Sequence, residues 1–218
     1  MHLTSINVAQ PQEMPGTARG TVVSAIHKLP VSGSVMLRTK NLDGDAQGDL
    51  VAHGGRDKAV YVYATEDYAY WREQLGWEMP NHGWFGENFT IKGAASDVVG
   101  LGDVWQVAEA IVQVTEPRSP CYKLDHKMGI TDFAARFARS GRVGFYLRVL
   151  REGSVEADAV VRVIERDPNG ATVTALSNLR HYGEGTLEDA QRMLAVESLP
   201  DGWKAFAQKM VDKAGVRT

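Results

Sequence analysis

Residues 104–121 read VWQVAEAIVQVTEPRSPC, and this stretch indicates the fold class most clearly. Apolar residues alternate with others over 104–107 and 110–115, which predicts two strands leading directly into the only cysteine of the chain. Further strands are predicted over 20–26, 31–37, 58–63, 89–91, 143–150 and 159–164. Many short strands with turn residues between them are typical of a barrel or sandwich rather than a Rossmann fold.

Helical patterns are fewer and lie mainly near the C-terminus. A helix is predicted over 65–76, because Thr65 is a suitable N-cap and Gly76 is a natural stop. Others are predicted over 130–138, 173–182, 186–196 and 203–213. The sequence therefore predicts a mainly β protein with α-helices, divided into a β domain over residues 1–169 and a small C-terminal helical module over residues 170–218.

The composition is that of an ordinary globular protein. The chain has 218 residues, 44% hydrophobic and 23% charged, with a net charge of −3, which gives no reason to expect nucleic acid as the main partner. No apolar run approaches the roughly 20 residues that cross a bilayer, and the N-terminus lacks a secretory signal pattern. With a single cysteine, these features predict a cytoplasmic protein in a reducing compartment, without a membrane partner.

Cys121 is the first candidate for chemistry. A lone thiol cannot form an intramolecular disulfide, so filler, nucleophile or soft-metal ligand remain as roles. Free cysteine is often a small buried apolar residue, and composition alone favours that interpretation. However, Arg118 and Lys123 place two cations near the sulfur, which favours the thiolate.

Residues 44–58 form a second candidate site. His53 precedes Gly54 and Gly55, which let backbone N–H groups approach a ligand closely, and Lys58 adds a cation. This combination suits a phosphate or another oxyanion. Short glycine motifs also occur in plain solvated loops, so the segment alone leaves both interpretations open.

Two weaker candidates follow. Asn88 lies with Glu87 in a polar segment before a predicted strand, where a plain turn is the simpler interpretation. Arg142 lies between glycines at the start of another strand and suits either bidentate phosphate contacts or a surface salt bridge. The sequence contains no zinc motif, Walker A loop, G-x-S-x-G or H-E-x-x-H pattern.

Four segments, at residues 28–31, 44–60, 86–90 and 117–123, together resemble MOSC-domain proteins of the YiiM-like subgroup, and in the same order. The resemblance spans residues 18–165, and the helical tail is similar to the C-terminal extension of that subgroup. It implies a MOSC β-barrel-like core that holds the molybdenum cofactor (molybdopterin), with Cys121 as the molybdenum ligand. By the same resemblance the cofactor pocket is expected to be lined by His53, Gly54, Gly55, Lys58, Asn88, Arg118, Lys123 and Arg142.

Roles within this set are assigned by charge. We expect Lys58, Arg118 and Arg142 to bind anionic groups and Asn88 to bind the pterin edge, with Lys28 as a weaker candidate. One departure from the family pattern is that this chain has Gly48 before Asp49, where family members often have Ala-Asp.

The resemblance also implies an activity. Relatives of this kind reduce N-hydroxylated compounds, including hydroxylaminopurine-type base analogues, so the implied enzyme is a molybdenum-dependent oxidoreductase that detoxifies such bases. The sequence has no flavin, haem or iron–sulfur motif, so electrons are expected from a separate reductase, a flavoprotein. The resemblance further carries a family-level association with pyridoxal phosphate binding. We expect Lys204, Lys209 and Lys213 of the tail to dock an acidic redox partner.

Two other functions stay open on the sequence. The first is a molybdenum cofactor carrier or sulfur-handling protein without reductase turnover. The second is a metal-free transferase with Cys121 as nucleophile, which needs a base such as His126, five residues further on.

Overall fold

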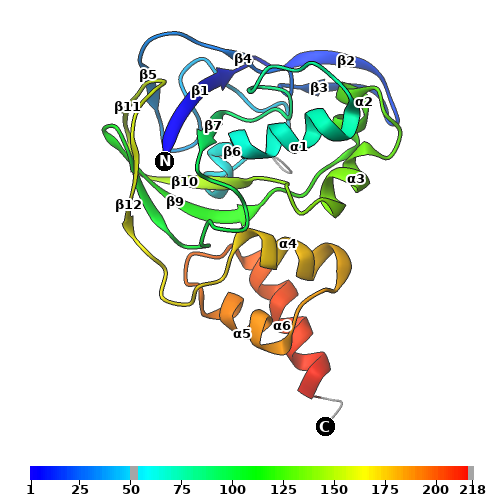
Figure 1. Cartoon of the computed structure of the whole chain (residues 1–218), viewed down its shortest axis with the longest axis vertical. Helices are drawn as coiled ribbons and strands as arrows, with labels where there is room; N and C mark the ends of the chain where they lie inside the picture. The colour runs from blue at the N-terminus through cyan, green and yellow to red at the C-terminus, as the bar shows by residue number, and fades with distance from the viewer. Residues whose placement is uncertain (50–53, 216–218) are drawn as a thin grey trace.

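The computed structural model describes residues 1–49 and 54–215, and within these residues eight strands form one mixed sheet (Figure 1). All neighbouring strands in it are antiparallel except the parallel pair β6 and β7. In spatial order the strands are β12 (Val161–Glu165), β8 (Val104–Val107), β9 (Ala110–Pro117), β10 (Phe145–Arg151), β6 (Val60–Ala64), β7 (Phe89–Lys92), β1 (His2–Val8) and β4 (Leu29–Pro30).

The sheet closes on itself between β1 and the start of β12. The Leu3 amide donates to the carbonyl of Ala159 at 3.0 Å, and the Asp158 amide donates back to Leu3 at 2.7 Å. The Val161 amide donates to the carbonyl of Met1 at 3.0 Å. These bonds join the two sides of the sheet, so the predicted β-barrel-like core is confirmed.

Two small strand pairs complete the β structure. The pair β2 (Gln12–Thr17) and β3 (Gly20–Ser24) forms a hairpin, and β5 (Val35–Leu37) pairs with β11 (Gly153–Val155). Strands β1, β2, β4 and β11 are absent from the sequence-based prediction. For β2 the reason is local, because its sequence QEMPGT contains proline and glycine and shows no apolar alternation.

Three α-helices and a short 3-10 turn connect the strands. Helix α1 (Thr65–Leu75) ends at Gly76 as predicted, but Ala64, not Thr65, is its N-cap. The helix predicted from residue 130 is α3 (Phe133–Arg139), and the turn η1 (Arg56–Lys58) precedes β6. Helix α2 (Tyr122–Met128) was not predicted, because its N-cap residue is Cys121, which is not one of the residue types that mark a helix start.

These helices cover a second apolar cluster, built largely of aromatic rings. The rings of Trp71 and Phe137 stack at 5.4 Å, and those of Tyr63 and Phe85 lie 4.6 Å apart. Tyr61, Tyr63, Tyr68 and Trp71 are all buried, so these aromatic side chains belong to the core. The cluster fixes α1, α2 and α3 against β6 and therefore fixes the chain on both sides of Cys121.

The helical module predicted after residue 169 is present as α4 (Val173–Tyr182), α5 (Leu187–Ala195) and α6 (Asp201–Gly215). Figure 1 shows these helices together on one side of the barrel. Thr186 caps α5 in a capping box with Asp189. No helix in the described part of the chain is long and apolar enough to cross a membrane.

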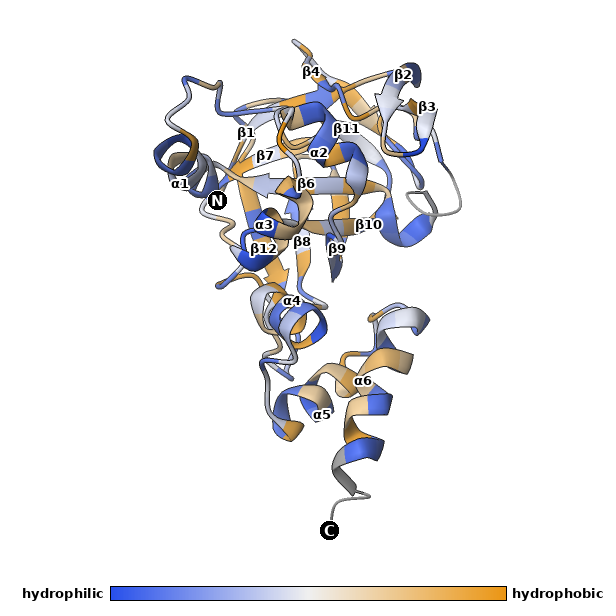
Figure 2. Cartoon of the chain, turned by 90° about the vertical axis from the view of Figure 1, so that its right-hand side faces the viewer, coloured by the Kyte–Doolittle hydropathy of each residue, from blue (hydrophilic) through white to orange (hydrophobic). Residues whose placement is uncertain are grey.

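The apolar core of the barrel continues into these helices. Leu176, Leu179 and Trp203 belong to the same buried cluster as Trp105 and Phe145 of the sheet. Figure 2 shows apolar residues along the central strands and along α6. The helices are thus packed on the barrel through a shared core, while the boundary near residue 169 as a division into domains stays a prediction.

Candidate functional site

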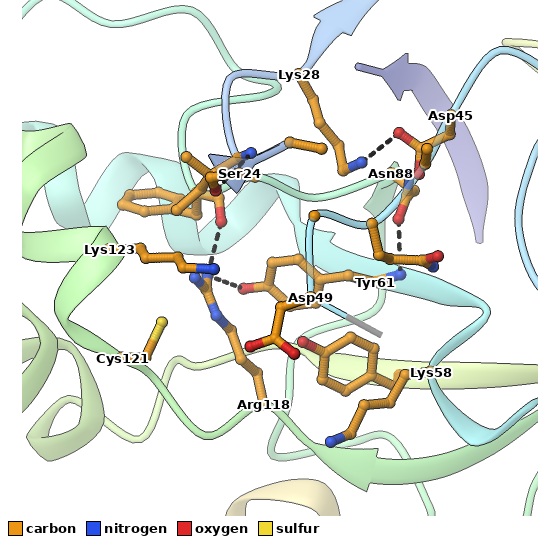
Figure 3. A pocket seen from close by; sticks show the side chains of 18 residues that line it. Ser24, Lys28, Asp45, Asp49, Lys58, Tyr61, Asn88, Arg118, Cys121 and Lys123 are labelled. Carbon is orange, nitrogen blue, oxygen red and sulfur yellow. Dashed lines mark hydrogen bonds and ion pairs between the residues drawn. The ribbon is translucent and has the colours of Figure 1, made fainter. Parts of the chain in front are cut away.

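A pocket beside Cys121 lies where several loops meet strands β6 and β10 (Figure 3). The space inside it is about 630 Å³, a volume that includes its open mouth. Eighteen of the described residues line it: Ser24, Ala25, Ile26, Lys28, Asp45, Ala46, Gln47, Gly48, Asp49, Lys58, Tyr61, Phe85, Gly86, Asn88, Arg118, Cys121, Lys123 and Tyr146.

Arg118 is the most buried cation of the pocket, with 6% of its surface exposed. Its backbone N–H donates to the carbonyl of Gly144 at 3.1 Å, which sets the chain direction after β9. Nη1 donates to the Tyr61 hydroxyl at 3.0 Å and to the Phe85 carbonyl at 2.6 Å. Among the described residues no carboxylate forms an ion pair with Arg118. A buried charge held only by neutral groups is costly, so an anionic ligand would stabilise it.

Two tyrosines form the wall next to Arg118. The rings of Tyr61 and Tyr146 lie 5.4 Å apart, and the Tyr61 hydroxyl donates to the carbonyl of Val143 at 2.8 Å. Burial raises the pKa of Tyr146 to about 12 and raises that of Tyr61 as well. Both hydroxyls therefore keep their protons at neutral pH and act as neutral hydrogen-bonding groups rather than bases.

The opposite wall is a network of Lys28, Asp45 and Asn88. The Lys28 ammonium pairs with the Asp45 carboxylate, and the two side chains are 8% and 1% exposed. Burial lowers the pKa of Lys28, an effect that Asp45 opposes. The Asn88 amide donates to Asp45 at 2.9 Å and accepts from the Tyr61 backbone N–H at 3.1 Å. Asn88 therefore fixes the wall, and its expected contact with a pterin edge stays a prediction.

Glu87, next to Asn88, has a structural role that its sequence did not reveal. It is fully buried, and its carboxylate accepts from the backbone N–H of Gly83 at 2.6 Å and of Phe85 at 3.2 Å. The Thr90 hydroxyl adds a third bond at 3.1 Å. The segment interpreted as a plain turn is thus held from inside, which positions Phe85 and Asn88 in the pocket.

Cys121 lies at the residue before α2, half-buried and without a disulfide. Lys123 follows in the first turn of α2, is buried, and has its Nζ atom 3.4 Å from the carbonyl oxygen of Val23. Figure 3 shows the thiol on the same side of the pocket as Lys123 and Arg118. The structure thus brings together the three residues that the cysteine segment predicted.

Lys58 reaches the pocket from η1. Its Nζ atom lies 3.9 Å from Oε1 of Glu116 and 5.9 Å from the centre of the Tyr146 ring. Burial raises the pKa of Glu116, an effect that the charge of Lys58 opposes. The described lining thereby carries more cations than carboxylates, namely Lys28, Lys58, Arg118 and Lys123 against Asp45 and Asp49.

The glycine segment takes a smaller part than predicted. Gly54 and Gly55 are not among the residues that line the pocket, and Gly55 is exposed with φ of 104°. His53 lies outside the described residues. Gly48, in the same region, does line the pocket. Only a glycine fits there without movement of its neighbours, because a Cβ would lie 2.6 Å from the Val23 carbonyl oxygen.

Arg142 lies away from the pocket, which corrects its predicted place in the lining. Its Nη1 atom lies 2.5 Å from Oδ1 of Asp67 in α1, and its guanidinium lies 4.9 Å from the centre of the Tyr70 ring. Asp67 is almost completely buried, and burial raises its pKa. The physical reason for the difference is this buried carboxylate, which draws the nearest guanidinium to α1.

Several site residues were missed from the sequence. Asp45 was not singled out within the candidate segment 44–58, and Tyr61 was predicted only as part of a strand. Tyr146, Phe85 and Ser24 carried no local signal, because they join the pocket through strand register and loop packing. Only the alternation around Tyr61 gave a hint, since it placed one face of that strand inside.

The described residues contain no group of three His, Cys, Asp or Glu side chains suited to hold a metal ion. Within the described lining, Cys121 is the one soft ligand. A metal at this site would therefore have to bring most of its ligands with it.

The chain is similar in sequence to a known domain family and to several bacterial proteins. A family model described as MOSC domain matches residues 49–162. Uncharacterized protein YflK of Bacillus subtilis (strain 168) is 37% identical over 209 residues, which cover 96% of this chain and 94% of the relative. Protein YiiM of Escherichia coli (strain K12) is 34% identical over 192 residues, covering 85% and 84%.

Two further similarities bear on fold and chemistry. The crystal structure of YiiM from Geobacillus stearothermophilus superposes with a TM-score of 0.79 at 30% identity, covering 96% of this chain and 98% of that one. A protein of Gibberella moniliformis (strain M3125 / FGSC 7600) named Reductase is 30% identical over 154 residues. That match covers 69% of this chain but only 27% of the fungal protein.

Proposed function

Since the chain belongs to the MOSC-domain family as a YiiM-like member, we propose that its pocket binds the molybdenum cofactor and reduces N-hydroxylated compounds, such as hydroxylaminopurine-type bases. The observation that carries this proposal is the single half-buried thiol of Cys121 in a pocket with Arg118 and Lys123. The relative named Reductase supports reductive chemistry.

The residues present fit this cofactor. Molybdopterin carries a dithiolene and a phosphate, so it supplies sulfur ligands of its own, and the protein would supply one further ligand to the metal. A thiolate from Cys121 suits a soft metal centre. Arg118, which has no carboxylate partner among the described residues, suits the anionic groups of the cofactor.

The chain's own residues would then bind and orient. Cys121 would hold the metal, while Lys58, Arg118 and Lys123 would bind anionic groups around it. Tyr61 holds the guanidinium of Arg118 in place, and Asp45 holds Lys28. When bound, the cofactor supplies two-electron oxygen-atom abstraction, which the protein alone lacks. The overall reaction takes R–NHOH, two electrons and two protons to R–NH2 and water.

The electrons must come from outside the chain, and a flavoprotein reductase docking at the C-terminal helices would supply them. Lys209 and Lys213 are exposed on α6, whereas the Lys204 ammonium donates to the Glu197 carbonyl at 2.8 Å. Deleting the helices would expose the shared core, so charge reversal is the cleaner test. The Lys209→Glu/Lys213→Glu variant should slow reduction by the partner but not by a chemical reductant, and Lys92→Glu on β7 is the control. Equal partner-driven rates would exclude this docking site.

Other functions compete for the same pocket. A cofactor carrier or sulfur-handling protein would bind molybdenum without turnover, and pyridoxal phosphate would present a phosphate to the same cations. A cysteine transferase receives less support, because His126 is not among the residues that line the pocket. Visible absorbance of the purified protein separates pyridoxal phosphate from molybdopterin.

Metal analysis of the wild type and Cys121→Ala, expressed in a host that makes the cofactor, tests the proposal. Ser119→Ala is the matched control, because Ser119 lies in the same segment but is exposed and outside the pocket lining. We expect stoichiometric molybdenum in the wild type and the control and little in Cys121→Ala, with the melting transition unchanged. Equal molybdenum in all three would refute the ligand role of Cys121. Molybdenum without turnover by a chemical reductant would favour the carrier.

A further inference from the structure

The C-terminal helices are linked, through side chains of β9 and β10, to the turn that brings Lys58 to the pocket. Glu116, at the end of β9, is buried and has its Oε1 atom 3.9 Å from Nζ of Lys58. Its other oxygen, Oε2, accepts a hydrogen bond from the indole N–H of Trp203 in α6. One carboxylate thus joins a cation of the pocket to a side chain 87 residues further along the sequence.

A second link reaches the residue before Lys58. Nη2 of Arg148 lies 2.8 Å from Oδ1 of Asp57 and 2.6 Å from the carbonyl oxygen of Ser198, between α5 and α6. The Thr115 hydroxyl also donates to the carbonyl of Asp57 at 2.7 Å. The turn that carries Lys58 is therefore held by β9 and β10, which in turn bond to the C-terminal segment.

The indole of Trp203 has little freedom to move. Its side chain is 4% exposed, and the Arg180 guanidinium of α4 lies 4.3 Å from the centre of its ring. The N–H is consequently aimed at Glu116 by the packing of two helices. The hydrogen bond from Trp203 satisfies one oxygen of the buried Glu116 carboxylate. The attraction of that carboxylate for the Lys58 ammonium is therefore weaker than it would be without the indole.

We propose that Trp203 is a positioning residue, which acts through Glu116 to keep the Lys58 ammonium available to an anion in the pocket. Without the indole N–H, the buried carboxylate would draw the Lys58 ammonium closer and away from a ligand. The C-terminal helices thereby form part of the binding site, although only their contacts with Glu116 and Arg148 reach it. This inference rests on the proposed function only in requiring that the pocket bind an anionic group.

A double-mutant cycle between Trp203→Phe and Lys58→Met tests the inference. The probe is inorganic phosphate, measured by titration calorimetry on the full chain from a host that makes no molybdopterin. We expect Trp203→Phe to weaken phosphate binding by about 3- to 10-fold in the wild type. In the Lys58→Met background, the same substitution should have no further effect, which a merely structural role would not produce.

Trp105→Phe is the matched control. Trp105 is buried like Trp203, but its indole nitrogen has no hydrogen-bond partner among the described residues. The control therefore removes the same atoms from the barrel core without breaking a link to Lys58, and it should leave phosphate affinity unchanged. If Trp203→Phe does not fold, benzothienylalanine at position 203 keeps the ring shape and removes only the N–H.

Three outcomes would overturn the positioning role. The first is an equal loss of phosphate affinity from Trp203→Phe in the Lys58→Met background. The second is an equal loss of phosphate affinity from Trp105→Phe, and the third is no phosphate binding by the wild type. Molybdenum content, measured separately on chains from a host that makes the cofactor, distinguishes this failure from that of the proposed function. If Trp203 and Lys58 are coupled in phosphate binding but the chain from the cofactor-producing host contains no molybdenum, the role of Trp203 stands and the proposed cofactor is refuted.

Discussion

Nη1 of Arg118 lies 3.0 Å from the hydroxyl oxygen of Tyr61, and its guanidinium carbon lies 4.7 Å from the centre of the same ring. The Tyr61 hydroxyl donates onward to the carbonyl of Val143, so its oxygen is free to accept from the arginine. Burial raises the pKa of Tyr61, which keeps it neutral. The pair therefore presents a positive charge to the pocket without cancelling it.

Replacing Arg118 by lysine should weaken anion binding although the charge is kept. Nη1 of the guanidinium makes both bonds, to Tyr61 and to the Phe85 carbonyl, whereas an ammonium has a single nitrogen and lacks the other two of the planar guanidinium. We expect phosphate affinity to fall by roughly 10- to 100-fold, or about 1.4–2.8 kcal/mol, in titration calorimetry. Arg38→Lys, at an exposed pair with Asp43, is the control. Unchanged affinity in Arg118→Lys would show that only charge matters here.

Lys127 should make stability depend on pH. Its ammonium donates to the carbonyls of Ile26 at 2.8 Å and Gly83 at 2.7 Å, and burial lowers its pKa from 10.5 to about 8. Between these values the unfolded chain binds the proton and the folded chain does not, so the free energy of unfolding rises with pH from about 8 towards 10.5.

Denaturant unfolding across this pH range measures the effect. Lys127→Met should lose the upward slope that the wild type gains from this group, whereas Lys92→Met, at an exposed position on β7, should keep it. Parallel slopes for the wild type and Lys127→Met would contradict the depressed pKa.

Gly48→Ala should displace the loop that carries Asp45 and Asp49. The added Cβ would lie 2.6 Å from the Val23 carbonyl oxygen, closer than such atoms approach. We expect a loss of roughly 1–3 kcal/mol in the free energy of unfolding, together with weaker phosphate binding. Gly202→Ala in α6 meets nothing within 4 Å and should be neutral or stabilising by up to about 1 kcal/mol. Wild-type stability and binding in Gly48→Ala would mean that the loop adjusts to the added methyl group without cost.

Arg142→Met should lower stability without affecting the cofactor. It would leave the Asp67 carboxylate, 1% exposed, without its ion pair. Because the Arg142 side chain is 42% exposed, we expect a loss of only about 1–2 kcal/mol in chemical denaturation. Molybdenum content should match the wild type, and Asp67→Asn added to the variant should restore part of the stability. A loss of molybdenum at unchanged stability would instead return Arg142 to the binding site.

Local sequence patterns predicted much of the fold. Helix α4 has the predicted bounds, α1 ends at Gly76 as expected, and β8 covers the predicted residues. These features depend on side-chain alternation and on stop residues, which act over a few neighbouring positions. The strand pattern left a barrel and a sandwich open, and the family resemblance favoured the barrel, because closure depends on bonds between Leu3 and residues 158–159, far apart in the sequence.

The sequence by itself determined that Cys121, Arg118 and Lys123 lie in one short segment, and the family resemblance predicted that Lys58 shares their site. Only the tertiary structure decided which other residues complete it. Asp45, Tyr61 and Tyr146 enter the pocket through strand register and loop packing, and Arg142 leaves it because the buried Asp67 carboxylate attracts it. The physical reason is range: periodicity and capping report on neighbours in sequence, whereas charge pairing and burial act between residues that meet only after the barrel closes.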